Sequence, residues 1–203
     1  RFKLFYNYIS LAGLDPKFFR IQFSIYKFLS KGKLEQQNRR SSMGTQARVV
    51  VLPQNSNTLR IESIELPDPK PNEVVVRQFA SGICHSQLHQ MHAPRKSPII
   101  LGHESTGIVL KAGSSVSHVN EGDIVMVTWV PRDIEAAANQ PEAANLQVSD
   151  GIATSQNVFT WADHTIADQQ YVVKVDPNIE KDVSAIIGCA VMTGAGAVIN
   201  TAD

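Results

Sequence analysis

The chain has 203 residues, with 19 basic and 19 acidic side chains and a hydrophobic content of 43%. This is the composition of an ordinary globular protein, and no apolar run approaches the 18 or so residues that a membrane-spanning helix needs. Two cysteines are too few for a disulfide framework and fit a reducing compartment. We therefore expect a cytoplasmic protein with neither a membrane nor a nucleic-acid partner.

Residues 1–42 differ in composition from the rest of the chain. They hold nine Lys and Arg against two acids, and nine of the fourteen aromatic residues. A transit peptide would be basic but not so aromatic, and a basic helix on a membrane surface would be interrupted by Gly13, Pro16 and Gly32. We favour a third hypothesis, in which this segment is translated sequence upstream of a start at Met43 and lies outside the fold. Mass spectrometry of the native N-terminus would test it.

Short segments rich in β-branched residues follow at regular intervals, separated by turns that contain Pro, Gly, Asn and Asp. Strands with this spacing are typical of a small β-barrel or sandwich, so the sequence predicts a mainly β fold. The predicted strands are 47–52, 59–66, 74–79, 107–110, 124–129 and 171–175.

The two cysteines and one histidine form a candidate metal-ligand set. Cys84 follows Gly82-Ile83, His103 comes 19 residues later in Gly102-His103-Glu104, and Cys189 follows Gly188. Two thiols and an imidazole suit zinc, and three protein ligands with one open position are typical of a catalytic zinc. Taken singly, however, a cysteine is usually a small buried hydrophobe, and a histidine usually a surface or core group.

The glycines around these residues make the pattern specific. Gly-His-Glu-x-x-Gly-x5-Gly-x2-Val, from Gly102 to Val116, resembles the signature of the zinc-containing alcohol dehydrogenases of the medium-chain dehydrogenase/reductase superfamily. The segments 82–86 and 188–194 resemble the first-ligand and last-ligand segments of that family. The resemblance covers residues 45–203. It implies a GroES-like catalytic domain over residues 43–178, in which Cys84, His103 and Cys189 hold one catalytic zinc.

The same resemblance implies an activity. Members reversibly oxidise an alcohol to an aldehyde or ketone, with NAD or NADP as the hydride carrier and zinc as the Lewis acid. Glu104 would lie near the zinc and assist ligand exchange. Ser86 and His89 match a proton relay, for which histidine suits neutral pH.

Three further residues match binding positions of the family. His85 would face the cofactor pyrophosphate, and Thr193 would lie near the nicotinamide. Trp129 would line the substrate pocket, and the size of its indole predicts a preference for small or slim primary alcohols.

The sequence departs from the family pattern at two places. Gln87 stands where an acid usually orients the zinc-bound histidine, so metal affinity or activity is expected to differ. The stretch Pro131 to Val158 contains none of the four cysteines that hold a second, structural zinc in many members. We therefore expect one zinc per chain.

The C-terminal residues predict a helix over 179–187 that ends at Gly188, and then a second apolar run over 189–201. In the family a Rossmann domain follows, yet the sequence has no Gly-x-Gly-x-x-Gly motif. We therefore expect a fragment, truncated at the entry to that domain, that binds zinc weakly and turns over no alcohol alone. The whole protein is expected to be a homo-oligomer.

Two alternatives from other classes stay open at this point. The zinc-free quinone reductase branch shares the fold but lacks the Cys/His/Cys set. A GroES-like binding module without catalysis would need no zinc signature.

Overall fold

The structure, a computed structural model, describes residues 44–133 and 141–202. The prediction for residues 1–42 therefore lies outside the described residues. Within the described ranges, no helix combines the length and the apolar character needed to cross a membrane.

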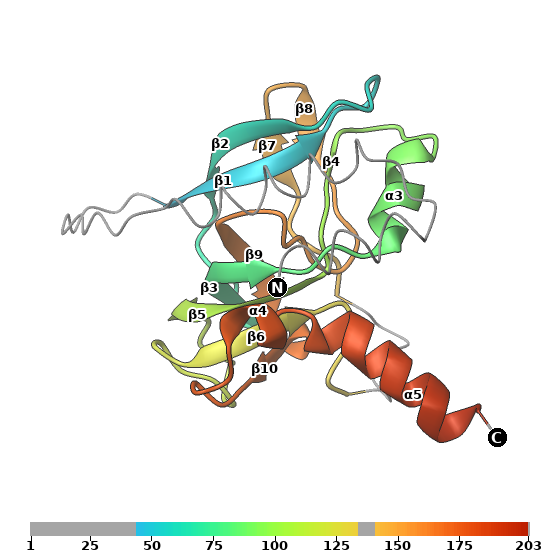
Figure 1. Cartoon of the computed structure of the whole chain (residues 1–203). Helices are drawn as coiled ribbons and strands as arrows, with labels where there is room; N and C mark the ends of the chain where they lie inside the picture. The colour runs from blue at the N-terminus through green and yellow to red at the C-terminus, as the bar shows by residue number, and fades with distance from the viewer. Residues whose placement is uncertain (1–43, 134–140, 203) are drawn as a thin grey trace. The chain divides into compact units, whose positions relative to one another are not determined.

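Two antiparallel sheets and one hairpin make up most of the described chain (Figure 1). The smaller sheet has the order β2-β1-β4, with β1 (Thr45–Leu52), β2 (Arg60–Leu66) and β4 (Ile99–Ile100). The larger sheet has the order β10-β6-β5-β3-β9, with β3 (Glu73–Ser81), β5 (Glu104–Ala112), β6 (Ile124–Thr128), β9 (His164–Asp168) and β10 (Val172–Lys174). The hairpin pairs β7 (Leu146–Val148) with β8 (Gly151–Ala153).

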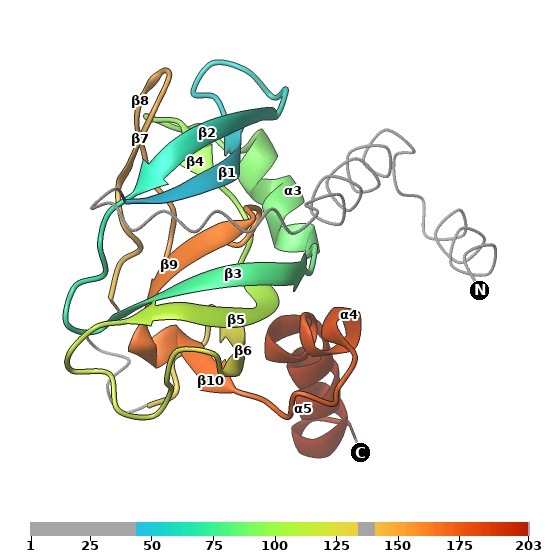
Figure 2. The ribbon, with the colours of Figure 1, turned by 90° about the vertical axis from the view of Figure 1, so that its left-hand side faces the viewer.

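The helices are short and lie between or after the strands. The α3 helix (His85–His92) follows β3, and a 3₁₀ turn (Gln169–Tyr171) precedes β10. The C-terminal part contains α4 (Lys181–Ser184), a π-helical turn (Ile187–Val191) and α5 (Met192–Asn200). In Figure 2, α4 lies next to the ends of β3 and β5, near the point where the chain leaves β3 towards α3.

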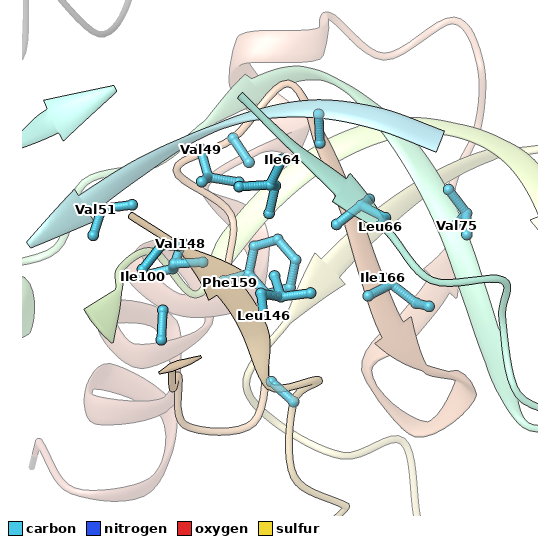
Figure 3. Close-up of a cluster of buried hydrophobic side chains, with 14 residues drawn as sticks. Val49, Val51, Ile64, Leu66, Val75, Ile100, Leu146, Val148, Phe159 and Ile166 are labelled. Carbon is cyan, nitrogen blue, oxygen red and sulfur yellow. The ribbon is translucent and has the colours of Figure 1, made fainter. Parts of the chain in front are cut away.

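The β3 strand is buried on both faces, and this divides the core into two clusters. Side chains alternate across a strand, so Val75 packs into one cluster while Val74 and Val76 pack into the other. All three are fully buried. The first cluster contains Phe159, which side chains from both sheets and from the hairpin surround (Figure 3).

The predicted mainly β fold is confirmed, and each of the six predicted strands overlaps an observed one. The prediction did not include β4, β7, β8 or β9, of which the first three have only two or three residues. It also began β5 too late, because the polar residues Glu104, Ser105 and Thr106 are buried strand residues here.

The helix predicted over 179–187 is wrong in its extent. The α4 helix stops at Ser184, and Gly188 does not end a helix but lies inside the π-helical turn. The Val191 N–H donates to the Ile186 carbonyl oxygen, five residues back, at 3.1 Å. The chain then continues directly into α5.

Candidate metal centre

The structure brings together the three predicted ligand residues, which lie as much as 105 residues apart in the sequence. Their potential donor atoms, two Sγ and one imidazole nitrogen, all lie within 4.8 Å of one another. His103 Nε2 is 3.3 Å from Cys189 Sγ, and the two sulfur atoms are 4.0 Å apart. In the described part of the chain, this is the group of three potential ligands compact enough to hold a metal ion.

The first donor sits at the start of a helix. Cys84 is the N-cap residue of α3, with extended backbone angles, and its N–H donates to Gln87 Oε1 at 2.7 Å. A cap of this kind satisfies one of the backbone donors that a helix leaves free at its first turn. The backbone of Cys84, which carries the thiol, is thereby held at the start of the helix.

The second donor, His103, lies between a glycine and the first residue of β5. Gly102 has a φ of 95°, and a Cβ at this residue would lie 2.5 Å from the backbone nitrogen of Trp161. Only glycine meets both conditions readily. The Gly-His sequence therefore has a local cause, because the chain must turn sharply where it directs the imidazole towards the two thiols.

The third donor, Cys189, is presented by the π-helical turn. The Thr128 hydroxyl at the end of β6 donates to the Gly188 carbonyl oxygen at 2.7 Å. A Cβ at Gly188 would lie 2.6 Å from Thr128 Cβ, so the turn approaches β6 more closely than another residue would permit. The Cys189 thiol is consequently buried beside the other two donors.

Glu104 places a carboxylate directly behind the donors. Its side chain is 1% exposed, and Oε2 lies 3.4 Å from the backbone nitrogen of Ala190, which donates to it. A Cβ at Gly82 would lie 2.5 Å from Glu104 Cδ, so glycine at residue 82 makes room for the carboxyl group. The carboxylate that the sequence predicts near the three donors thus lies in a buried site next to Ala190 and Gly82.

Burial favours the neutral forms of these groups. Burial raises the pKa of Glu104 to about 7. Burial also raises the pKa of the Cys189 thiol to about 11, and the neighbouring Glu104 and Cys84 add to the effect. Burial lowers the pKa of His103, which keeps its ring neutral. Two thiols, a neutral imidazole and a nearby acid are a donor set that fits zinc, because a dication favours the deprotonated thiols.

The predicted proton relay is only partly assembled. Ser86 lies in the first turn of α3, with its Oγ 3.5 Å from His103 Nδ1. His89 is exposed one turn later, and its ring packs edge-on against His85 with centroids 4.8 Å apart. Within the described residues no hydrogen bond joins Ser86 to His89. His85 is likewise exposed, at the start of the helix beside the donors.

Trp129 and Thr193 lie at different distances from the centre. The Trp129 ring centroid is 6.3 Å from that of His103, and the side chain is 45% exposed just beyond β6. Thr193 is exposed in the first turn of α5, four residues after Cys189. The roles of both residues remain predictions.

A pocket beside His103 contains residues that the sequence reasoning did not name. Three of them carry carboxamides, two of which follow β8, in a loop that no motif singles out. The pocket is lined by Gln90, Ile100, Leu101, Gly102, His103, Trp129, Gln156, Asn157 and Val158. A polar run before the buried segment 158–162 was the available signal, but it is equally typical of a surface loop.

Comparisons with known proteins agree with the fold. A family model described as "Alcohol dehydrogenase GroES-like domain" matches residues 70–177. Alcohol dehydrogenase B of Mycobacterium tuberculosis is 31% identical over 167 residues, which cover 70% of this chain and 44% of that protein. An alcohol dehydrogenase zinc-binding domain protein from Burkholderia ambifaria superposes with a TM-score of 0.67 at 24% identity, over 77% of this chain and 49% of the other. Benzyl alcohol dehydrogenase from Acinetobacter calcoaceticus gives a TM-score of 0.64 at 23% identity, over 77% and 48%.

The fold and the donor set together define a GroES-like domain with a candidate three-ligand metal centre. The chain belongs to the alcohol dehydrogenase GroES-like domain family. The predicted GroES-like fold is therefore confirmed. The chain spans a little under half the length of the relatives that it matches.

Proposed function

We propose that this chain forms the zinc-binding catalytic domain of an alcohol dehydrogenase, which interconverts alcohols with aldehydes or ketones by hydride exchange with NAD or NADP. The observation that carries the proposal is the convergence of Cys84, His103 and Cys189 within 4.8 Å beside a pocket. Neither the zinc-free branch of the superfamily nor a non-catalytic binding module would require these three residues to lie together.

A zinc ion held by Cys84, His103 and Cys189 would supply Lewis-acid polarisation of the substrate oxygen and would lower the pKa of an alcohol hydroxyl. Leu101, Val158 and the Trp129 indole line the pocket and would contact the carbon chain of the substrate. Ser86 Oγ would accept the alcohol proton while its own hydroxyl proton passes through water to the exposed ring of His89, three residues further along α3, and from there to solvent.

His85 and Thr193 are proposed to contact the nicotinamide cofactor. His85 is exposed at the start of α3, and Thr193 is exposed at the start of α5. Both residues are therefore available to a ligand that approaches the centre from outside.

Metal analysis of the purified protein tests the metal centre. We expect one zinc per chain, and its loss in Cys84→Ser and His103→Ala variants. Ser86→Ala is the matched control, because Ser86 lies next to the centre but is not one of the three donors. Zinc retained in His103→Ala would contradict the proposed ligand set.

Cobalt substitution then tests the catalytic role. Cobalt(II) bound by two thiolates should show charge-transfer absorption, and a bound primary alcohol should change its visible spectrum. The control is a neutral solute of similar size and equal concentration that carries no hydroxyl group. A cobalt spectrum that no alcohol alters would argue for a purely structural metal.

A further inference from the structure

The side chain of Gln87 connects the start of α3 to the imidazole of His103. It is 1% exposed, and its Oε1 accepts a hydrogen bond from the Cys84 N–H at 2.7 Å. Its Nε2 lies 2.7 Å from His103 Nδ1. The amide group thus touches two of the three donor residues.

The contact with Cys84 determines which way the amide points. A backbone N–H can only donate, so the oxygen of Gln87 must face Cys84 and the NH₂ group must face His103. An amide NH₂ also only donates, so His103 Nδ1 must accept. A neutral imidazole then carries its proton on Nε2, which is the ring nitrogen that faces Cys189 Sγ at 3.3 Å.

This arrangement opposes metal binding through Nε2. A metal needs the lone pair of Nε2, so the proton of a neutral ring must sit on Nδ1. Nδ1–H and the amide NH₂ would then be two donors face to face. If the amide turned over instead, its NH₂ would face the Cys84 N–H.

In either arrangement one buried hydrogen bond is lost when the metal binds. The other acceptor close to Nδ1, Ser86 Oγ, stands at 3.5 Å, at the limit of hydrogen bonding. A carboxylate in place of the amide would accept from both donors at once.

We propose that Gln87 is a positioning residue that holds His103 in the tautomer protonated at Nε2 and thereby weakens metal binding at this centre. The proposal rests on the proposed function in one respect, namely that Cys84, His103 and Cys189 bind zinc. It makes the metal occupancy of the chain depend on a residue that does not itself touch the metal.

Zinc affinity, measured by competition with a chromogenic chelator under reducing conditions, tests the proposal in the full chain. Gln87→Glu is expected to bind zinc about tenfold more tightly than the unaltered protein, or tighter still. Gln90→Glu adds the same charge on α3 beside the pocket without touching Nδ1, and a change of less than about threefold is expected. Equal affinity of Gln87→Glu and the unaltered protein, or an equal gain in Gln90→Glu, would overturn the proposal.

The tautomer of His103 gives a second readout that needs no metal. Nitrogen-detected NMR of the metal-free protein should show the His103 proton on Nε2 in the unaltered protein and on Nδ1 in Gln87→Glu. A proton already on Nδ1 in the unaltered protein would overturn the proposal. Metal-free thermal melts of both proteins verify that Gln87→Glu is folded.

The two hypotheses fail in different ways. If His103→Ala binds zinc as well as the unaltered protein, the proposed metal centre is wrong, while the NMR tautomers still decide the role of Gln87. If zinc binding requires His103 but is indifferent to Gln87→Glu, the metal centre stands and the role of Gln87 is rejected.

Discussion

At the level of single residues, Trp129 lines the pocket beside His103, and we predict that it restricts the size of the substrate. Its ring centroid lies 6.3 Å from the His103 ring, and it shares the pocket wall with Leu101 and Val158. Trp129→Ala removes the indole and should admit wider alcohols. In the cobalt-loaded protein, we expect the apparent affinity for a branched or aromatic alcohol to improve about tenfold relative to that for a short primary alcohol. An unchanged ratio between the two alcohols would reject this role for Trp129.

Gly82 tests how tightly Glu104 is enclosed. An added Cβ at residue 82 would lie 2.5 Å from Glu104 Cδ, so the buried carboxyl group would have to shift. We expect Gly82→Ala to lower the free energy of unfolding by about 1–3 kcal/mol. Urea denaturation of the metal-free protein measures the change.

A second glycine provides the matched control. Gly194 lies in α5, and a Cβ there would meet nothing within 4 Å. Gly194→Ala should therefore leave stability unchanged or raise it by up to about 1 kcal/mol, because alanine favours the helix. A similar loss in both variants would mean that crowding at Glu104 is not the cause.

At the level of elements, one ion pair fastens β1 to the segment before β9. Asp163 Oδ2 lies 2.7 Å from Arg48 Nε, and Asp163 Oδ1 accepts from the Arg48 backbone N–H and lies 2.9 Å from His164 Nδ1. Burial acts to raise the pKa of Asp163, but the hydrogen bonds from His164 and Arg48 outweigh it and lower the pKa to about 2. The ionised carboxylate is therefore the form that the folded protein prefers.

The sign of the resulting pH dependence follows from this shift. The folded pKa is lower than the ordinary value of 3.8, so the stabilisation is complete above about pH 4 and is lost as the pH falls towards 2. Asp163→Asn should lower the free energy of unfolding by about 1–2 kcal/mol at neutral pH, a range that allows for the partial exposure of Arg48. The difference from the unaltered protein should shrink below about pH 4 in urea titrations.

The control for this prediction is a more exposed ion pair. Asp68 lies 2.8 Å from Lys111 Nζ, and its side chain is 80% exposed. Asp68→Asn should shift the urea midpoint much less than Asp163→Asn at every pH. Equal shifts would indicate a general effect of charge.

The elements that the sequence predicted share a plain physical cause. Strands such as β1 and β3 contain uninterrupted β-branched residues, and this pattern reports burial directly. The β7 and β8 strands have three residues each, which is too short for any periodicity. The sequence did not predict the polar start of β5, because Glu104 and Thr106 are buried through tertiary contacts. One of these is the hydrogen bond that the Thr106 hydroxyl donates to the Val125 carbonyl oxygen.

The candidate site also has one part that the sequence predicts and another that it does not. The three donor residues could be chosen from the sequence because local glycines accompany each of them. The contacts that hold them could not, since the bond from Thr128 to Gly188 joins residues 60 apart and that from Gln87 to His103 joins residues 16 apart. Such contacts depend on how elements approach one another, which no local pattern encodes.

At the level of the whole molecule, a metal at this centre would link three distant segments of the chain. Ligands from the residue before β5, the start of α3 and the π-helical turn come together only in the folded state. Binding to the folded state alone stabilises it by about 2.7 kcal/mol when the free metal exceeds its Kd a hundredfold. Zinc should therefore raise the Tm, and a chelator should reverse the rise.

Limited proteolysis adds a local measurement to that prediction. Chelation should increase cleavage within α4 and α5 more than within the sheets, because Cys189 fastens this part to the centre. Cys189→Ser serves as the comparison, and its Tm should not respond to zinc. A zinc-dependent Tm in that variant would place the stabilising metal elsewhere.

The π-helical turn has a consequence for how this segment can change during evolution. A π-helical turn holds one residue more than the equivalent α-helical turn, so its loss would rotate everything after it by about 100° about the helix axis. Deleting any single residue between Ile187 and Val191 would turn the Cys189 thiol or the following α5 away from its present direction, even with every side chain conserved. The segment should thus accept substitutions at several positions but no insertions or deletions. Its length would then be more strictly conserved than the identity of its residues.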